Sequence, residues 1–318
     1  MAIINNNRQH RTGAMQNKRL GKFVTLVWFC VLSAVSFAGS FEETSTKAKA
    51  GDAEAQFQLG RMYFLGHGVG KDEVESAKWV RKSAEAGNTH AQFNLASMYA
   101  EGRGVSKDDG EAVKWYRKTA EAGNILAQRN LGFLYAEGRG ISKDGAEAVK
   151  WLRKSAQGGD ANAQNYLGAM YAEGRGVSKD EVEAVNWFRK AAEAGDAEAQ
   201  RNLGVMYAKG RGVGKDDAEM EKWFRKAAEA GIVDVQYGLG VRYDEGNGVI
   251  KSNAEAVKWY RKAAEAGDAE AQCALAWKLL SGRGVAKDPT EAVKWYRKAA
   301  AQGSENAKQE LVRLGENP

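Results

Sequence analysis

The apolar positions of residues 91–126 fall into two stripes with the period of an α-helix. The first stripe has intervals of four, three and one residue and consists of Ala91, Leu95, Met98 and Tyr99. The second has intervals of three, one and four residues and consists of Ala112, Trp115, Tyr116 and Ala120. Such spacing gathers apolar side chains on one helix face. The segment therefore predicts two amphipathic helices, which we call helix A and helix B.

Glycine and acidic residues mark the ends of both helices. Gly102 follows helix A and Gly123 follows helix B, where glycine adopts the left-handed conformation at low steric cost. Asp108 precedes helix B, with Glu111 three residues later. Its side chain can cap the first turn, which is worth about 1 kcal/mol. These signals predict one helix–turn–helix unit.

The unit recurs every 36 residues. Tryptophan marks helix B at Trp79, Trp115, Trp151, Trp187, Trp223, Trp259 and Trp295. Tyrosine, or leucine in the last copy, marks helix A at Tyr63, Tyr99, Tyr135, Tyr171, Tyr207, Tyr243 and Leu279. The helix B cap recurs as Asp72, Asp108, Asp144, Asp180, Asp216, Ser252 and Asp288, each with glutamate three residues later. A cap also precedes helix A, except in the sixth copy, where Ile232 takes its place.

Self-similarity at this period predicts a solenoid. We expect an all-α fold, a right-handed α–α superhelix in which tryptophan and tyrosine fill the core between closely packed helices. The seven repeats are predicted at 55–90, 91–126, 127–162, 163–198, 199–234, 235–270 and 271–306. Residues 39–54 are expected to form a lead-in and N-terminal cap, flexible over 39–48. Residues 307–318 are expected to form a C-terminal capping helix and tail.

The first 38 residues have the plan of a secretory signal peptide. A basic cluster without acidic residues precedes an apolar stretch over 23–38, which ends in small residues at Ser36 and Ala38. We predict cleavage after Ala38 and a periplasmic or secreted protein. The alternative is a membrane anchor, but a spanning helix needs about 20 apolar residues, more than this stretch provides. Met15 is an alternative to Met1 as the translation start, because a basic segment would still precede the apolar stretch.

Charge and cysteine content narrow the function. The net charge of +6 suggests nucleic-acid binding, but five of the 47 basic residues lie in the predicted leader, which leaves 42 basic against 41 acidic residues. We therefore expect no nucleic-acid partner. After cleavage Cys273 is the remaining cysteine, so no intramolecular disulfide is possible. We interpret it as an interior or groove residue, with a disulfide-linked dimer left open.

The sequence offers no pattern typical of an active site. The Gly-Arg-Gly-Val loops, such as 102–105 and 210–213, resemble phosphate-binding loops only superficially, and their recurrence favours a structural turn. His67 and His90 lack the neighbours of a metal site. We expect no catalytic residue, no metal and no cofactor.

The repeats resemble those of the Sel1-like repeat family, relatives of the tetratricopeptide repeats. The resemblance rests on Ala-Gln-x-x-Leu-Gly-x-x-Tyr in helix A and Glu-Ala-x-x-Trp-Tyr-Arg-Lys-Ala-Ala-Glu-x-Gly in helix B, clearest at 91–123, 163–195 and 199–231. It implies an α-solenoid with scaffold or adaptor work among protein partners, in exported members within the cell envelope. The resemblance to cysteine-rich relatives also raises β-lactamase-like activity as an alternative. Those relatives carry a pair of cysteines in each repeat, and this chain has no such pair.

The positions of helix A that differ between repeats predict a partner-binding groove. The third and seventh positions of the repeat vary most and share one helix face. The candidates are Phe57, Arg61, Phe93, Ser97, Arg129, Phe133, Asn165, Arg201, Tyr237 and Trp277. Arginine and aromatic residues are favoured binding anchors. Two alternatives stay open: the variation is merely tolerated, or the aromatic ends bind peptidoglycan or another envelope polysaccharide. The Lys-Arg pairs of helix B, such as Arg117 and Lys118, predict a solvated face of mixed charge.

Overall fold

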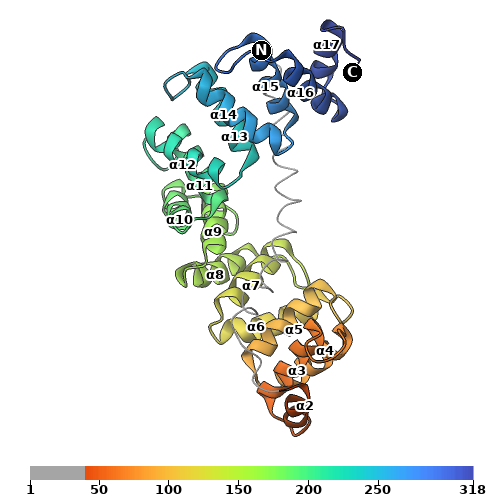
Figure 1. Cartoon of the computed structure of the whole chain (residues 1–318). Coiled ribbons are helices and arrows are strands. Elements are labelled where there is room, and N and C mark those ends of the chain that lie inside the picture. Colours follow the sequence, from red (N-terminus) through yellow and green to blue (C-terminus); the bar gives the residue numbers. More distant parts are fainter. Residues whose placement is uncertain (1–39, 318) are drawn as a thin grey trace. The chain divides into compact units, whose positions relative to one another are not determined.

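A computed structural model describes residues 40–317 of the protein, which form sixteen α-helices and no strand (Figure 1). The predicted leader and its cleavage point lie outside these residues. The helices are α2 (Phe41–Lys49), α3 (Ala53–Leu65), α4 (Glu73–Glu85), α5 (Thr89–Glu101), α6 (Asp109–Glu121), α7 (Ile125–Glu137), α8 (Gly145–Gln157), α9 (Ala161–Glu173), α10 (Glu181–Glu193), α11 (Ala197–Lys209), α12 (Asp217–Glu229), α13 (Val233–Glu245), α14 (Asn253–Glu265), α15 (Ala269–Ser281), α16 (Pro289–Ala301) and α17 (Glu305–Arg313).

The described chain divides into two compact units, 40–158 with α2–α8 and 159–317 with α9–α17. Within each unit every helix packs against the next one in sequence, so the pairs stack in series as a solenoid requires. Helix A is α3 and each odd-numbered helix through α15, and helix B is α4 and each even-numbered helix through α16. The predicted all-α repeat fold is confirmed. Among the described helices, none is both long and apolar enough to cross a membrane.

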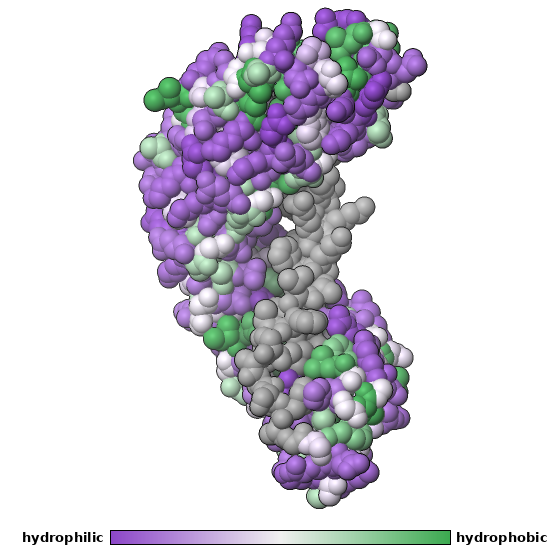
Figure 2. Space-filling view, in the orientation of Figure 1, coloured by the Kyte–Doolittle hydropathy of each residue, from purple (hydrophilic) through white to green (hydrophobic). Residues whose placement is uncertain are grey.

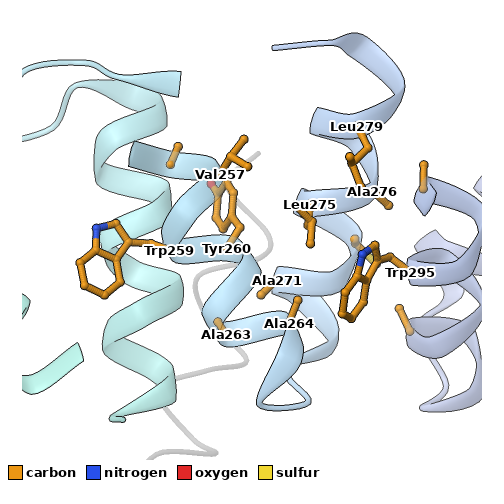
Figure 3. Packing of buried hydrophobic residues seen from close by; sticks show 14 of the residues in the cluster. Val257, Trp259, Tyr260, Ala263, Ala264, Ala271, Leu275, Ala276, Leu279 and Trp295 are labelled. Atoms are coloured by element: carbon orange, nitrogen blue, oxygen red, sulfur yellow. The ribbon is translucent and has the colours of Figure 1, made fainter. Parts of the chain in front are cut away.

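The predicted tryptophan core is present. Trp151, Trp187, Trp223, Trp259 and Trp295 are buried, while Trp79 and Trp115 are half-buried. Figure 3 shows Trp259 and Trp295 in one cluster with the alanine and leucine side chains of α14 and α15. The indole nitrogen of Trp187 donates to Glu183 at 2.8 Å, and the lysine three residues on, Lys190, lies 4.3 Å from the ring. The indole is therefore fixed by a hydrogen bond at its ring nitrogen and by a lysine ammonium over its ring face.

The predicted caps are formed. All seven helix B caps accept from backbone amides of the first turn, as Asp72 does at 2.9 Å from Val74 and Glu75. The backbone N–H of Asp72 itself donates to the carbonyl of Tyr63 at 2.9 Å. The glutamate three residues after the cap is therefore not needed as an acceptor for the N–H of the capping residue. It accepts from a lysine side chain instead, as Glu75 does from Lys78. Ile232 makes no side-chain cap, as expected.

The glycines of the repeat permit close backbone contacts. At Gly204 in α11, a Cβ would lie 2.5 Å from the Phe224 ring of α12. At Gly212, in the loop after α11, the φ of +65° and a Cβ 2.0 Å from the Glu181 carbonyl oxygen both exclude a larger residue. The Gly-Arg-Gly loops are therefore structural turns that rest on the preceding repeat, as predicted.

Two side chains join neighbouring repeats at recurring positions. The glutamine at the second repeat position donates to an alanine carbonyl of the preceding helix B, as Gln92 does to Ala84 at 3.1 Å. The arginine of helix B donates to the next tyrosine hydroxyl, as Arg117 does to Tyr135 at 2.7 Å. Lys118 remains exposed and lies 5.5 Å from the Trp115 ring. The expected solvated face of mixed charge on helix B holds for Lys118 but is wrong for Arg117, which is half-buried and stabilises the contact between repeats.

The expected flexible lead-in over 39–48 is wrong, because most of it forms α2. Ser40 caps this helix, and Ala48 is buried against α3. The carbonyl of Ala48 accepts from Gln56 at 3.2 Å, as Ala84 does from Gln92. Helix α2 therefore takes the place of a helix B before the first repeat and caps the stack, with packing that its own polar sequence did not reveal.

The C-terminal capping helix is confirmed as α17, capped by Ser304, with Ala307 and Leu311 buried. Each helix A begins two residues before the repeat boundary that we predicted, because its capping residue lies directly before it, as Asn88 does before α5.

Candidate functional site

Four of the ten predicted groove residues are buried in the unit 40–158. Phe57, Arg61, Ser97 and Arg129 are at most 8% exposed. Burial lowers the pKa of the Arg61 guanidinium below its usual range. The expectation that these four side chains line an open groove is therefore wrong.

Their burial follows from how helix A meets its neighbours. The third repeat position faces the start of the next helix A: Phe57 stacks on His90 with ring centroids 6.3 Å apart. The seventh position faces helix B of the same repeat: the hydroxyl of Ser97 lies 2.8 Å from that of Tyr116. The residue type at these positions therefore varies with the side chain that the neighbouring helix places against it. Variation here is not a sign of partner binding alone.

Phe93 and Phe133 are half-buried. The Phe93 ring packs edge-on against Tyr116 with centroids 5.7 Å apart, so part of its area is committed to the core. These two residues remain partly accessible on the helix A face of the unit 40–158.

In the unit 159–317, Asn165 and Arg201 link neighbouring helices A. The amide of Asn202 in α11 donates to the side-chain oxygen of Asn165 in α9 at 2.9 Å. The Arg201 guanidinium lies 3.0 Å from both Glu198 and Asp234, the latter in the first turn of α13. Both residues are half-buried, and the Asn165 side-chain oxygen and the two terminal nitrogens of Arg201 are already engaged.

The remaining candidates, Tyr237 and Trp277, belong to a set of partly accessible apolar residues on α13 and α15 that we call the α13–α15 surface. It consists of Tyr237, Gly238 and Val241 on α13 with Ala274 and Trp277 on α15. Trp277 is 41% exposed, and the other four are half-buried. Tyr237, Val241 and Ala274 pack on the same buried cluster (Figure 3 shows part of it). On the face of the molecule that Figure 2 shows, hydrophilic residues predominate, so an exposed tryptophan such as Trp277 is a candidate contact residue for a partner.

Sequence reasoning missed the fourth repeat position, which contributes Gly238 and Ala274. It follows the third position directly, and a helical stripe wider than two positions would have included it. A Cβ at Gly238 would meet no atom within 4 Å, so this glycine leaves an open position beside Tyr237. Tyr237 itself rests on Tyr260 of α14, with ring centroids 5.8 Å apart.

An ion pair below this surface ties α15 to α13. Lys278, 1% exposed, donates to Asp244, and also to the side-chain oxygen of Asn253 at 2.9 Å. In most other repeats a methionine occupies the position of Lys278. The pair therefore fixes the two helices that carry Tyr237 and Trp277 with respect to each other.

Cys273 is an interior residue, as predicted. Its thiol lies 3.5 Å from the Ser304 hydroxyl, and burial raises its pKa above the usual value. A raised pKa keeps the thiol protonated and poorly nucleophilic. Across residues 40–317, no three His, Cys, Asp or Glu side chains gather as a metal site would require.

Comparison with known proteins agrees with this architecture. The Sel1 repeat matches seven consecutive segments: 53–88, 89–124, 125–160, 161–196, 197–232, 233–268 and 269–304. No curated protein matches the chain. Among solved structures, the chain is similar to c5321, a protective antigen present in uropathogenic Escherichia coli strains and displaying an SLR fold. The two share 39% identity with a TM-score of 0.82, over 87% of this chain but 59% of that one.

A Sel1 repeat protein from Oxalobacter formigenes is similar at 35% identity with a TM-score of 0.76, over 86% of this chain and 80% of that one. The seven repeat matches run without a gap through most of the sequence. The chain therefore belongs to the Sel1 repeat family.

Proposed function

We propose that the protein is an exported scaffold or adaptor that holds a protein partner in the cell envelope. Sel1 repeats generally mediate protein–protein interactions, and the family is generally non-enzymatic. The observation that carries the proposal is the α13–α15 surface, where Trp277 on α15 is exposed and the apolar residues Tyr237 and Val241 on α13 are half-buried. Tryptophan and tyrosine are enriched among the residues that dominate protein-binding energy.

The fold supports this role because the α13–α15 surface stands on rigid elements. Tyr237 rests on Tyr260, and the ion pair of buried Lys278 with Asp244 fixes the spacing of the two helices. A preformed surface loses little conformational entropy when a partner binds. Partner capture by this face therefore requires no large rearrangement of the repeats.

Site-specific photocrosslinking in cells tests the role. A photoreactive amino acid at Ala274 is expected to give a discrete adduct that mass spectrometry identifies, and Trp277→Ala is expected to reduce it. The matched control places the same group at Lys294, an exposed residue on α16. Equal adducts from both positions, or none from Ala274, would contradict partner binding at the α13–α15 surface.

Export is tested separately by N-terminal sequencing of the protein from the fractionated envelope. The basic cluster, the apolar stretch and the small residues before Gly39 support cleavage after Ala38. We expect the mature chain to start at Gly39. A full-length chain confined to the cytoplasm would contradict export but would leave the α13–α15 surface untouched.

A further inference from the structure

The arginine of the Gly-Arg-Gly loop has a carboxylate partner in four repeats. Arg103 lies 2.8 Å from Glu101, and Arg139 lies 2.7 Å from Asp109. Arg175 lies 2.7 Å from Glu173, and Arg211 lies 2.7 Å from Glu181. The repeat therefore contains a built-in acceptor for this guanidinium.

The carboxylate comes from one of two places. One is the last residue of helix A, two positions before the arginine, as in Glu173 for Arg175. The other is the first residue of the preceding helix B, thirty positions before, as in Glu181 for Arg211. Arg175 lacks the second carboxylate because Gly145 stands there, and Arg211 lacks the first because Lys209 stands there. Each of these arginines still keeps one acidic partner.

Arg283, in the seventh repeat, lacks both. Ser281 stands at the end of its helix A, and Asn253 at the start of the preceding helix B. The Asn253 oxygen also accepts from Lys278. Within residues 40–317 no carboxylate lies in ion-pair distance of Arg283, which is exposed and lies 5.1 Å from the centroid of the Trp277 ring.

This arrangement suits the binding of an anion next to an apolar group. A guanidinium held against an aromatic ring keeps N–H groups at its edge for a carboxylate, and it loses less freedom on binding than a mobile one. The indole belongs to the α13–α15 surface, so a group on Arg283 lies at the margin of that surface. The positive charge of Arg283 and the apolar ring of Trp277 are therefore both accessible at one place.

Resting on the function proposed above, we propose that the partner supplies the missing carboxylate. The occupant is an acidic peptide segment of another protein. Its Asp or Glu side chain pairs with Arg283, and a neighbouring apolar side chain packs on Trp277. A side-chain carboxylate is the expected acceptor because Asp109, Glu173 and Glu181 supply that group to the equivalent arginines.

The test measures fluorescence anisotropy of the full chain with two labelled peptide libraries. Both are nonapeptides with a fixed central pair, Phe-Glu in one and Phe-Gln in the other, and with amidated C-termini. We expect the Phe-Glu library to bind about tenfold tighter, because a hydrogen bond to a charged group accounts for such a factor. Equal binding of the two libraries would overturn the proposal.

Variants place the effect at Arg283. Ser281→Glu restores the acid that precedes Arg103 and Arg175 without removing any binding residue, and it should weaken Phe-Glu binding about tenfold by pairing Arg283 internally. Arg283→Gln should do the same. The matched control, Arg211→Gln, removes an arginine that already has its acid and should leave binding unchanged. Unaltered binding by Ser281→Glu and Arg283→Gln together would contradict the site.

Two further arms separate other outcomes. A Phe-Gln library with a free C-terminus that binds as tightly as the Phe-Glu library would replace the side-chain carboxylate by a terminal one and overturn this assignment. Sedimentation with purified peptidoglycan that depends on Arg283, without peptide binding, would overturn it in favour of a polysaccharide. An in-cell crosslink at Ala274 that Arg283→Gln leaves unchanged would contradict the acidic-segment inference alone, whereas absence of the crosslink would contradict the scaffold role.

Discussion

The fifth and seventh repeats share one packing scheme but carry different chemistry. In both, a glutamine of helix A donates to an alanine carbonyl of the preceding helix B, Gln200 to Ala192 and Gln272 to Ala264. Trp223 and Trp295 are buried in both. They differ on helix A, where Val205, Met206 and Lys209 become Trp277, Lys278 and Ser281. The shared residues therefore maintain the stack, while substitutions near the end of one helix create a surface.

Truncation of a tryptophan is expected to give the largest difference between the two repeats. Trp223→Ala removes a buried indole from the fifth repeat and should lower the free energy of unfolding by about 3–5 kcal/mol. Trp277→Ala removes an exposed indole and should change it by about 0.5 kcal/mol or less. Urea denaturation followed by circular dichroism measures both. Similar losses would show that Trp277 is a core residue and not part of a binding surface.

The ion pair of buried Lys278 with Asp244, which joins the sixth and seventh repeats, gives the next largest effect. Asp244→Ala leaves the Lys278 ammonium buried without its carboxylate and should destabilise by about 3 kcal/mol. Adding Lys278→Met recreates the equivalent residues of the fourth and fifth repeats, Ala172 and Met206, and should restore stability to within about 1 kcal/mol. The same denaturation experiment measures both variants. A double variant as unstable as the single one would mean that the pair does more than replace a methionine contact.

Two glycines with positive φ separate the cost of a steric clash from the cost of an unfavourable backbone conformation. Gly212→Ala meets both a positive φ and the Glu181 carbonyl, and should destabilise by about 2–3 kcal/mol. Gly231→Ala has a φ of +92° with no atom within 4 Å, so about 1 kcal/mol is expected from conformation alone. The midpoint of thermal unfolding orders the two variants. Equal shifts would show that the loop yields to the new Cβ.

The smallest effect concerns the engaged loop arginine of the fifth repeat. Arg211 and Lys179 lower the pKa of Glu181 to about 2. A lowered pKa stabilises the fold above the ordinary glutamate pKa of about 4.3, and that contribution is lost as the pH falls toward 2. Arg211→Gln should therefore raise the pKa of Glu181, which carboxyl NMR resonances report. Arg283→Gln, with no carboxylate beside it, should shift no carboxyl resonance comparably.

The period, the caps and the turns could be predicted because each depends on residues within one repeat. Tryptophan spacing identified seven units, and capping residues such as Asp108 located the helix ends. The burial of Phe57, Arg61, Ser97 and Arg129 could not be predicted in this way, since it depends on what the adjoining helix presents. Helix α2 was missed for the same reason: Ala48 becomes buried only when α3 is present.

The candidate site was predictable in part. Tyr237 and Trp277 were identified as variable residues of helix A, and the structure places both on the α13–α15 surface. Gly238 escaped notice because an absent side chain gives no chemical signal. Arg283 was hidden because it matches the common loop. Arg283 differs because neither Ser281 nor Asn253 carries a carboxylate. The importance of these two positions is evident only from the structure, where the equivalent acids of other repeats contact the loop arginine.

The recurring bond from glutamine to alanine carbonyl makes the junctions between repeats interchangeable. Loss of one whole repeat from the gene, such as residues 197–232, would bring Gln236 to the carbonyl of Ala192, which already accepts from Gln200. Duplication would likewise create a junction with the same donor and acceptor. Unequal recombination can thus lengthen or shorten such a chain without a new interface having to evolve, while the specialised last repeat is carried along intact.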